Sequence, residues 1–431
     1  MFKIRKKKRG RSYYLFPMAW VAVLTGVIFI GVYNSPLGNE PDQQIKADEP
    51  SQAEQKDKKE TGYEDEGRKR ITENGTEYKL EEKIDNWLET MTLEEKTAQL
   101  FVVTPETIGG EEAVDQAGET LLQGLREYPV GGLVYFSQNL ISPEQTRGML
   151  NKTRAYGKRA AGLPLFLCVD EEGGTVARIG NNPEFSVDKV EDMEQIGGKQ
   201  DRKAAYEAGK TIGNYLSDLG FNLDFAPVAD VFTNPDNQVV KKRSFGSDPQ
   251  LVSDMAYQVE KGLSDCGILG VYKHFPGHGA TSGDTHEGYA YTEKELEEML
   301  HTDLLPFFQA SEQKVPLIMA GHIGAPKVTG NDMPSSLSYT MITEVLREKL
   351  GYDGIVITDA LNMGAIQEQY DSAQACVMAV KAGADMLLMP ADFEAGYKGI
   401  LEAVETGTIT EDRLDESVRR ILRIKLNLTE D

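Results

Sequence analysis

Three of the chain's five histidines lie in one glycine-rich stretch, "KHFPGHGATSGDTHEG", between residues 273 and 288. Asp284 and His286 are two residues apart there, so in an extended segment their side chains would share one face. A tight turn could equally bring the carboxylate onto the imidazole. A carboxylate beside an imidazole raises its basicity and fixes its orientation, as a general acid/base near neutral pH requires. The stretch predicts an acid/base pair on a loop that its glycines allow to move.

A metal site is the competing interpretation of this stretch. His274 and His278 are four residues apart, with His286 downstream, but Pro276 and Gly277 prevent a helix that would bring the first two to one face. The chain has no H-E-x-x-H motif either. We therefore expect no metal and no cofactor. For His278 and for His322 further along the chain, a purely structural role remains the alternative.

Several polar residues follow short apolar runs of the sequence. Asp359 ends the run in "GIVITDALNMGAI", where viewed alone it would be interpreted as a helix N-cap. Other runs end in the same way, at Asp170, Asp230, Lys273 with His274, and His322. A barrel gathers the carboxyl ends of its parallel strands at one mouth, so these side chains are expected to share a site.

Eight such runs alternate with longer segments of helical period, the pattern of βα units in a parallel sheet. They begin at residues 100, 132, 165, 223, 270, 316, 354 and 385. The clearest amphipathic segments are Pro143–Ala160, Asp201–Leu219, Ser247–Ser264, Glu293–Ser311 and a closing helix from Glu411. This pattern predicts an α/β fold, a (β/α)8 TIM barrel forming a single catalytic domain over residues 79–431. A doubly wound open sheet is the alternative.

The N-terminal part has a different composition. Residues 13–33 carry no charge and as a helix would be about 30 Å long, which predicts a transmembrane anchor. The basic residues 1–12 are then cytoplasmic, and the catalytic domain lies outside the cytoplasm. Residues 34–78 are rich in polar side chains and predict a disordered, flexible linker. A cleaved signal peptide, giving a secreted protein, is the alternative, although no A-x-A site follows.

The formal charge of −23 excludes a role in binding phosphate backbones, so no nucleic-acid partner is expected. The three cysteines are too scattered for a disulfide framework or a zinc motif and are expected to be buried small residues. We expect a monomer.

Seven motifs resemble glycoside hydrolase family 3, in particular its β-N-acetylhexosaminidase (β-N-acetylglucosaminidase) branch. The resemblance covers roughly residues 80–428, and the motifs occur in this order: "VDEEGGTVARI", "LDFAPVADV", "RSFGSDP", "KHFPGHG" with "DTH", "MAGHI", "PSSLS" and "ITDAL". The resemblance implies that Asp359 is the catalytic nucleophile and that His286 with Asp284 is the acid/base dyad. It also implies that five residues hold the sugar hydroxyls, namely Asp170, Arg178, Arg243, Lys273 and His274. The branch usually has Asp-Ser-His at the dyad, where this chain has Thr285 in the middle.

The expected activity is that of a membrane-tethered, retaining β-N-acetylglucosaminidase. It would remove terminal β-linked GlcNAc from peptidoglycan fragments or related glycans through a covalent glycosyl-aspartate. The β-glucosidase branch takes its acid/base from a second domain, and no segment after the eighth unit predicts one. Two alternatives remain: a phosphorylase, since histidine repels phosphate less than glutamate would, and a wall-binding module without catalytic activity.

Overall fold

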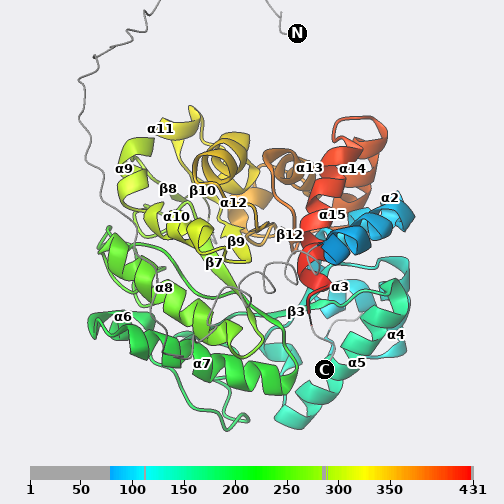
Figure 1. The fold of residues 1–431 in the computed structure, drawn as a ribbon, viewed down its shortest axis with the longest axis horizontal. Coiled ribbons are helices and arrows are strands. Elements are labelled where there is room, and N and C mark those ends of the chain that lie inside the picture. Colours follow the sequence, from blue (N-terminus) through cyan, green and yellow to red (C-terminus); the bar gives the residue numbers. More distant parts are fainter. Residues whose placement is uncertain (1–77, 111–112, 284–287, 289, 429–431) are drawn as a thin grey trace, which may run out of the picture. The chain divides into compact units, whose positions relative to one another are not determined.

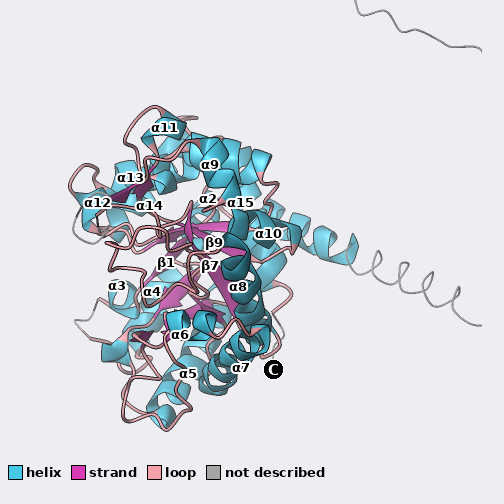
Figure 2. Ribbon diagram, turned by 90° about the vertical axis from the view of Figure 1, so that its left-hand side faces the viewer, coloured by secondary structure: helices cyan, strands magenta, loops and turns pink. Residues whose placement is uncertain are grey.

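Eight short parallel strands form the centre of the computed structural model, which describes residues 78–110, 113–283, 288 and 290–428 (Figures 1 and 2). Their bounds are β1 (Phe101–Val103), β2 (Gly132–Val134), β3 (Phe166–Val169), β6 (Leu223–Asp224), β7 (Leu269–Phe275), β9 (Leu317–Ala320), β11 (Ile355–Thr358) and β12 (Leu387–Leu388). Each strand coincides with one of the eight predicted apolar runs, although β7 begins one residue before its run. The prediction of eight strands is therefore confirmed.

These strands pair in chain order, and every pair is parallel. β12 pairs with β1 on one side, and a parallel bridge between Ile357 and Met386 joins it to β11 on the other. The Thr358 N–H donates to the Met386 carbonyl at 3.0 Å across this join. The last strand thus pairs with the first, as in a TIM barrel. The alternative prediction of an open doubly wound sheet is therefore wrong.

The helices form the outer layer around these strands (Figure 2). The larger ones are a helix over residues 78–90, α2 (Leu93–Gln99), α4 (Glu119–Glu127), α5 (Pro143–Ala161), α7 (Arg202–Leu219), α8 (Pro249–Ser264), α10 (Leu305–Glu312), π-helix η3 (Thr340–Lys349), α13 (Ser372–Ala382), α14 (Phe393–Glu405) and α15 (Glu411–Lys425). The shorter ones are α3 (Pro105–Gly109), α6 (Met193–Gly198), α9 (Leu296–His301), α11 (Pro326–Thr329), α12 (Gly364–Gln367) and the 3₁₀ turns η1 (Ser137–Asn139) and η2 (Ser335–Leu337). Asp248 and Thr410 cap α8 and α15 by accepting backbone N–H bonds, which fixes where these helices begin.

The predicted helix over Glu293–Ser311 is wrong as a single element. The structure divides it into α9 and α10, and Thr302 between them has non-helical dihedrals of φ −128° and ψ −95°. Pro306 then lies in the first turn of α10, where its missing N–H costs no hydrogen bond. The other predicted helices agree with α5, α7, α8 and α15 to within two residues at their starts.

Two small sheets that the sequence did not predict extend the chain beyond the barrel strands. β4 (Glu171–Gly173) and β5 (Val176–Ala177) form an antiparallel pair directly after β3. β8 (Ala290–Tyr291) pairs in parallel with β10 (Ile323–Gly324), which follows β9. Both therefore lie at the carboxyl ends of barrel strands.

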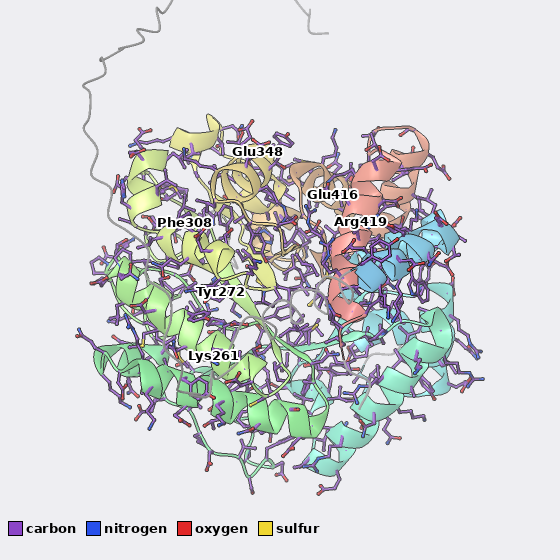
Figure 3. The ribbon with its side chains drawn as sticks, in the orientation of Figure 1. Lys261, Tyr272, Phe308, Glu348, Glu416 and Arg419 are labelled. Carbon is purple, nitrogen blue, oxygen red and sulfur yellow. The ribbon has the colours of Figure 1, made fainter. Side chains whose placement is uncertain are left out.

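Successive side chains of β7 point to opposite sides of the strand, one toward the packed core and the next toward the barrel interior. Tyr272 is fully buried, and its successor Lys273 faces the opposite side of the strand. Figure 3 shows Tyr272 on β7, whereas Lys261 and Phe308 extend from α8 and α10 of the outer layer. Phe308 is 42% exposed. Because Tyr272 packs on one side of β7, the side chain of Lys273 points to the other side, into the interior of the barrel.

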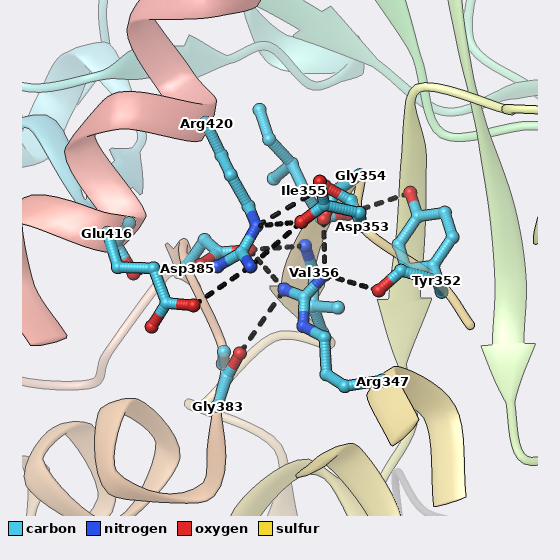
Figure 4. Close-up of polar contacts among 12 residues, drawn as sticks. Arg347, Tyr352, Asp353, Gly354, Ile355, Val356, Gly383, Asp385, Glu416 and Arg420 are labelled. Carbon is cyan, nitrogen blue, oxygen red and sulfur yellow. Dashed lines mark hydrogen bonds and ion pairs between the residues drawn. The ribbon is translucent and has the colours of Figure 1, made fainter. Parts of the chain in front are cut away.

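A buried carboxylate fastens β12 to β11 (Figure 4). Asp385, fully buried just before β12, accepts from the Val356 N–H at 2.9 Å and from Arg347. Its other oxygen accepts from the Ser417 hydroxyl at 2.8 Å and from Arg420 at 3.3 Å. Burial alone would raise the pKa of Asp385, but the surrounding arginines lower it below its ordinary value. The carboxylate thus joins β11, β12, η3 and α15.

No helix within the described ranges is long and apolar enough to cross a membrane. The predicted anchor at residues 13–33 and the basic segment 1–12 lie outside those ranges, as does the predicted linker 34–78 apart from its last residue. The described residues all belong to one of the two units into which the chain divides, Tyr63–Asp431.

Asp385→Asn should lower the free energy of unfolding by about 3–5 kcal/mol, because the neutral amide leaves three partly buried arginines, Arg347, Arg413 and Arg420, without their shared buried anion. Denaturant unfolding monitored by circular dichroism measures the loss. The matched control is Asp353→Asn, whose carboxylate pairs with the same Arg420 at 3.0 Å but is 79% exposed. The control should cost no more than about 1 kcal/mol. Equal losses in the two variants would contradict the closing role of Asp385.

Candidate active site

A cavity of about 330 Å³ lies at the carboxyl ends of the barrel strands. Six of the eight predicted site residues line it: Asp170, Arg178, Arg243, Lys273, His274 and Asp359. They come from positions after β3, in and before β7 and after β11, which are far apart in the sequence. Closure of the barrel therefore brings these predicted residues together.

A chain of alternating charges runs along one wall of the cavity. Lys273 Nζ lies 2.9 Å from Asp170 and 2.7 Å from Glu172. Glu172 also accepts two bonds from Arg243, each of 2.7 Å. Arg178 is 3.8 Å from the second oxygen of Asp170. The three cations are thus held by two carboxylates, and Glu172 contacts two of the three.

All members of the Lys273–Glu172–Arg243 triad stay ionised, although Lys273 and Glu172 are buried and Arg243 is partly buried. Burial lowers the pKa of Lys273, but the charges of Glu172 and Asp170 outweigh it and hold that pKa above its ordinary value. Burial likewise raises the pKa of Glu172, yet Arg243 and Lys273 bring it well below the usual range. The triad therefore presents fixed charges to the cavity.

Asp230 positions two histidines. One of its oxygens lies 2.7 Å from His274 Nδ1, and the other accepts the backbone N–H groups of His274 and His278 at 3.1 and 2.6 Å. Asp230 is fully buried, and His274 lowers its pKa against the opposing effect of burial. Because a carboxylate only accepts hydrogen bonds, His274 Nδ1 carries a proton.

Asp359 stands at the end of β11 with its backbone N–H bonded to the Ala320 carbonyl at 2.8 Å. Its carboxylate accepts from the Ala360 N–H at 2.8 Å. Burial acts to raise the pKa of Asp359, but His322, His274, this backbone bond and Lys273 together lower it below its ordinary value. The carboxylate is therefore an anion at neutral pH, with oxygen lone pairs that can attack an electrophile.

His322 supports the segment that follows Asp359. Its Nε2 lies 2.9 Å from the Ala360 carbonyl, which can only accept, so Nε2 carries a proton. Its Nδ1 lies 2.7 Å from the Ser336 hydroxyl. This fully buried ring fits the structural role considered for it from the sequence.

Asp284 and His286 lie outside the described residues, so their positions stay predictions. The structure does describe the ends of their segment, where Ser282 and Tyr291 exchange backbone bonds of 3.2 and 3.3 Å. Two glycines of the same stretch also have close neighbours that a side chain would meet. A Cβ on Gly279 would lie 2.1 Å from the Val231 carbonyl, and one on Gly277 would lie 2.7 Å from Asp303 Cβ.

Metal binding finds no support where the chain is described, because no group of three or more His, Cys, Asp or Glu side chains there is arranged to hold an ion. His286 of the alternative metal interpretation is not among these residues.

Glu172 is a site residue that the sequence alone does not single out, whereas Asp230 is expected at the shared site without a defined role. Glu172 stands two residues after Asp170, within the quoted "VDEEGGTVARI", so the period of an extended segment places both on one face. Asp230 follows a strand end in the sequence, but spacing does not reveal its contacts with His274 and His278.

A parallel barrel whose strand ends carry ionised carboxylates and cations has the architecture of a TIM-barrel enzyme. Residues 92–424 match the family model described as glycosyl hydrolase family 3 N terminal domain. The chain therefore belongs to glycosyl hydrolase family 3, a family of hydrolases.

Three similar proteins illustrate this membership. Beta-hexosaminidase LpqI of Mycobacterium tuberculosis is 34% identical over 77% of this chain and 82% of its own length. Beta-hexosaminidase A of Pseudoalteromonas piscicida is 32% identical over 70% of this chain but only 54% of its own length. The solved family 3 β-N-acetylglucosaminidase from Paenibacillus sp. str. FPU-7 has a TM-score of 0.74 and 34% identity, covering 78% of this chain and 62% of that one.

Glu172→Gln should destabilise the fold by about 3–5 kcal/mol, because it removes the anion that Arg243 and Lys273 share in a buried site. Chemical unfolding at neutral pH measures the change. Glu184→Gln, a change of the same type at an exposed position, serves as the control and should alter stability by less than about 0.5 kcal/mol. If Glu172→Gln were as mild as the control, the triad would not be the electrostatic unit inferred from its distances.

Proposed function

We propose that the protein is a retaining β-N-acetylglucosaminidase that removes terminal β-linked GlcNAc by hydrolysis. The observation that carries the proposal is the cavity in which the ionised Asp359 faces Lys273, Arg243 and His274. The names of its relatives, beta-hexosaminidase and β-N-acetylglucosaminidase, support the same sugar.

In this mechanism Asp359 attacks the anomeric carbon and forms a glycosyl ester, which water then hydrolyses. His286, oriented by Asp284, protonates the leaving oxygen in the first step and deprotonates the attacking water in the second. The charged groups of the cavity wall, Asp170, Arg178, Arg243 and Lys273, together with His274, bind the sugar hydroxyls. Charge-assisted hydrogen bonds from such fixed groups are short and strong, which favours one orientation of the ring.

The N-terminal residues bear on where the protein acts and on which glycans it meets. We propose that residues 13–33 anchor the chain in the membrane, with residues 1–12 in the cytoplasm and 34–78 as the linker. The barrel then acts outside the cytoplasm, as a monomer, on peptidoglycan fragments or related glycans. The support is the uncharged 13–33 segment and the basic residues before it.

One assay tests the activity. The enzyme should hydrolyse 4-nitrophenyl β-GlcNAc faster than the β-GalNAc and β-Glc glycosides, and NMR should show the β-anomer of GlcNAc as the first product. Addition of inorganic phosphate should leave this product unchanged. Accumulation of GlcNAc-1-phosphate would instead identify a phosphorylase, and absence of turnover on every glycoside would favour a binding module.

The proposed roles of Asp359 and His286 imply a particular pH dependence of kcat/KM. The rate constant kcat/KM should follow a bell, because Asp359 must be ionised and His286 protonated. The acid limb should lie below pH 4, since the pKa of Asp359 is held below its ordinary value of 3.8. The alkaline limb should lie above about 6.5, because ionised Asp284 favours the imidazolium.

Asp284→Asn removes that charge, so the alkaline limb should move to lower pH while the acid limb stays in place. Measurement of kcat/KM between about pH 2 and pH 9 for both proteins covers both limbs and gives the comparison. An alkaline limb unmoved in the variant would mean that Asp284 does not set the charge of the histidine.

A further inference from the structure

His278 lines the same cavity as Asp359 and is 3% exposed. Its backbone is fixed on both sides: the N–H donates to Asp230 at 2.6 Å, and the carbonyl accepts from Asn237 Nδ2 at 2.8 Å. Its ring meets that of His274 edge to face, with centroids 5.9 Å apart. The imidazole therefore occupies one defined position beside the triad of fixed charges.

The hydrogen bonds of Thr281 identify the tautomer of this ring. The Thr281 hydroxyl donates its only proton to the His278 carbonyl at 2.8 Å. The same oxygen lies 2.7 Å from His278 Nδ1, so it must accept there, and Nδ1 carries the proton. In a neutral ring the other nitrogen, Nε2, then bears a lone pair.

Nε2 of His278 is buried and has no hydrogen-bond partner among the described residues. A buried acceptor without a partner costs about 1–3 kcal/mol, and folded proteins leave few of them. Protonation does not remove the problem, because burial, together with nearby His274 and Arg243, lowers the pKa of His278 against the effect of Asp230. The ring thus stays neutral at physiological pH and keeps its lone pair.

We propose that Nε2 of His278 accepts a hydrogen bond from a hydroxyl or the amide N–H of the bound amino sugar, which makes His278 a specificity-determining residue. The inference rests on the proposed function, because that function supplies the ligand. Lys273 and Arg243 can only donate, so a neutral acceptor adds a contact that these cations do not provide. A site built to bond one donor rejects an analogue that lacks it, because its own polar group is then left unpaired.

Two substitutions separate the ring nitrogens. His278→Asn keeps an amide N–H where Nδ1 meets Thr281 but removes Nε2, whereas His278→Gln places an amide oxygen near the position of Nε2. The substrates are 4-nitrophenyl β-GlcNAc and analogues that each lack one donor, namely the 3-, 4- and 6-deoxy sugars and the N-methylated acetamide. For wild type, loss of the bonded donor should lower kcat/KM about tenfold relative to the parent.

In His278→Asn, the ratio of kcat/KM for the parent to kcat/KM for that analogue should fall from about ten toward one, and the ratios for the other analogues should not change. His278→Gln should retain part of the tenfold ratio. Preferences unchanged in His278→Asn for every analogue would overturn the proposal. If the wild-type enzyme were inactive on all GlcNAc glycosides, the proposed function would be contradicted. This outcome can be distinguished from failure of the His278 proposal, in which the wild-type enzyme is active. If His278→Asn does not fold, the ¹⁵N resonance of wild-type Nε2 decides: saturation with GlcNAc should shift it, and binding without a shift overturns the assignment.

Discussion

Asp385 joins the last strand of the barrel to the strand that carries Asp359. Its carboxylate accepts the Val356 N–H, and its own N–H donates to the Val356 carbonyl at 2.7 Å, so both polar groups of one residue on β11 are bonded to it. Several arginines make the buried carboxylate tolerable in an apolar interior. With β12 fixed between β11 and β1, the ring is complete and the carboxyl ends of its strands face one cavity.

A second buried carboxylate, Glu172, lies at that cavity and is also neutralised by neighbouring cations. Glu172 is nearly as buried as Asp385 and is likewise matched by cations, but its partners Lys273 and Arg243 also line the space that a ligand would occupy. Fixed charges need no rearrangement when a polar sugar enters, so the geometry is prepared before binding. His322, His274 and Lys273 also lower the pKa of Asp359. Under the proposed function, Lys273 would therefore both bind the sugar and help to keep the nucleophile ionised.

The strands were predictable because buried parallel strands are continuous apolar runs, and the polar residues after them marked the site. Asp170, Lys273 and Asp359 were found in this way. Glu172 was missed as a partner because Arg243 is 71 residues away, and such pairing depends on barrel closure. The break between α9 and α10 lies at Thr302, ahead of Pro306 in the first turn of α10, and helical periodicity alone does not reveal it. The dyad Asp284 and His286 rests on the sequence, since neither residue is described.

Closure of the barrel holds Asp359 at the mouth, where we propose that it is the nucleophile. A 5-fluoro analogue of GlcNAc with a reactive leaving group should accumulate as a glycosyl-enzyme, because the fluorine slows both formation and hydrolysis of the ester whereas the reactive leaving group speeds only its formation. Peptide mass spectrometry should then find one sugar on Asp359. A label on another carboxylate, or a GlcNAc product of inverted configuration, would contradict the account.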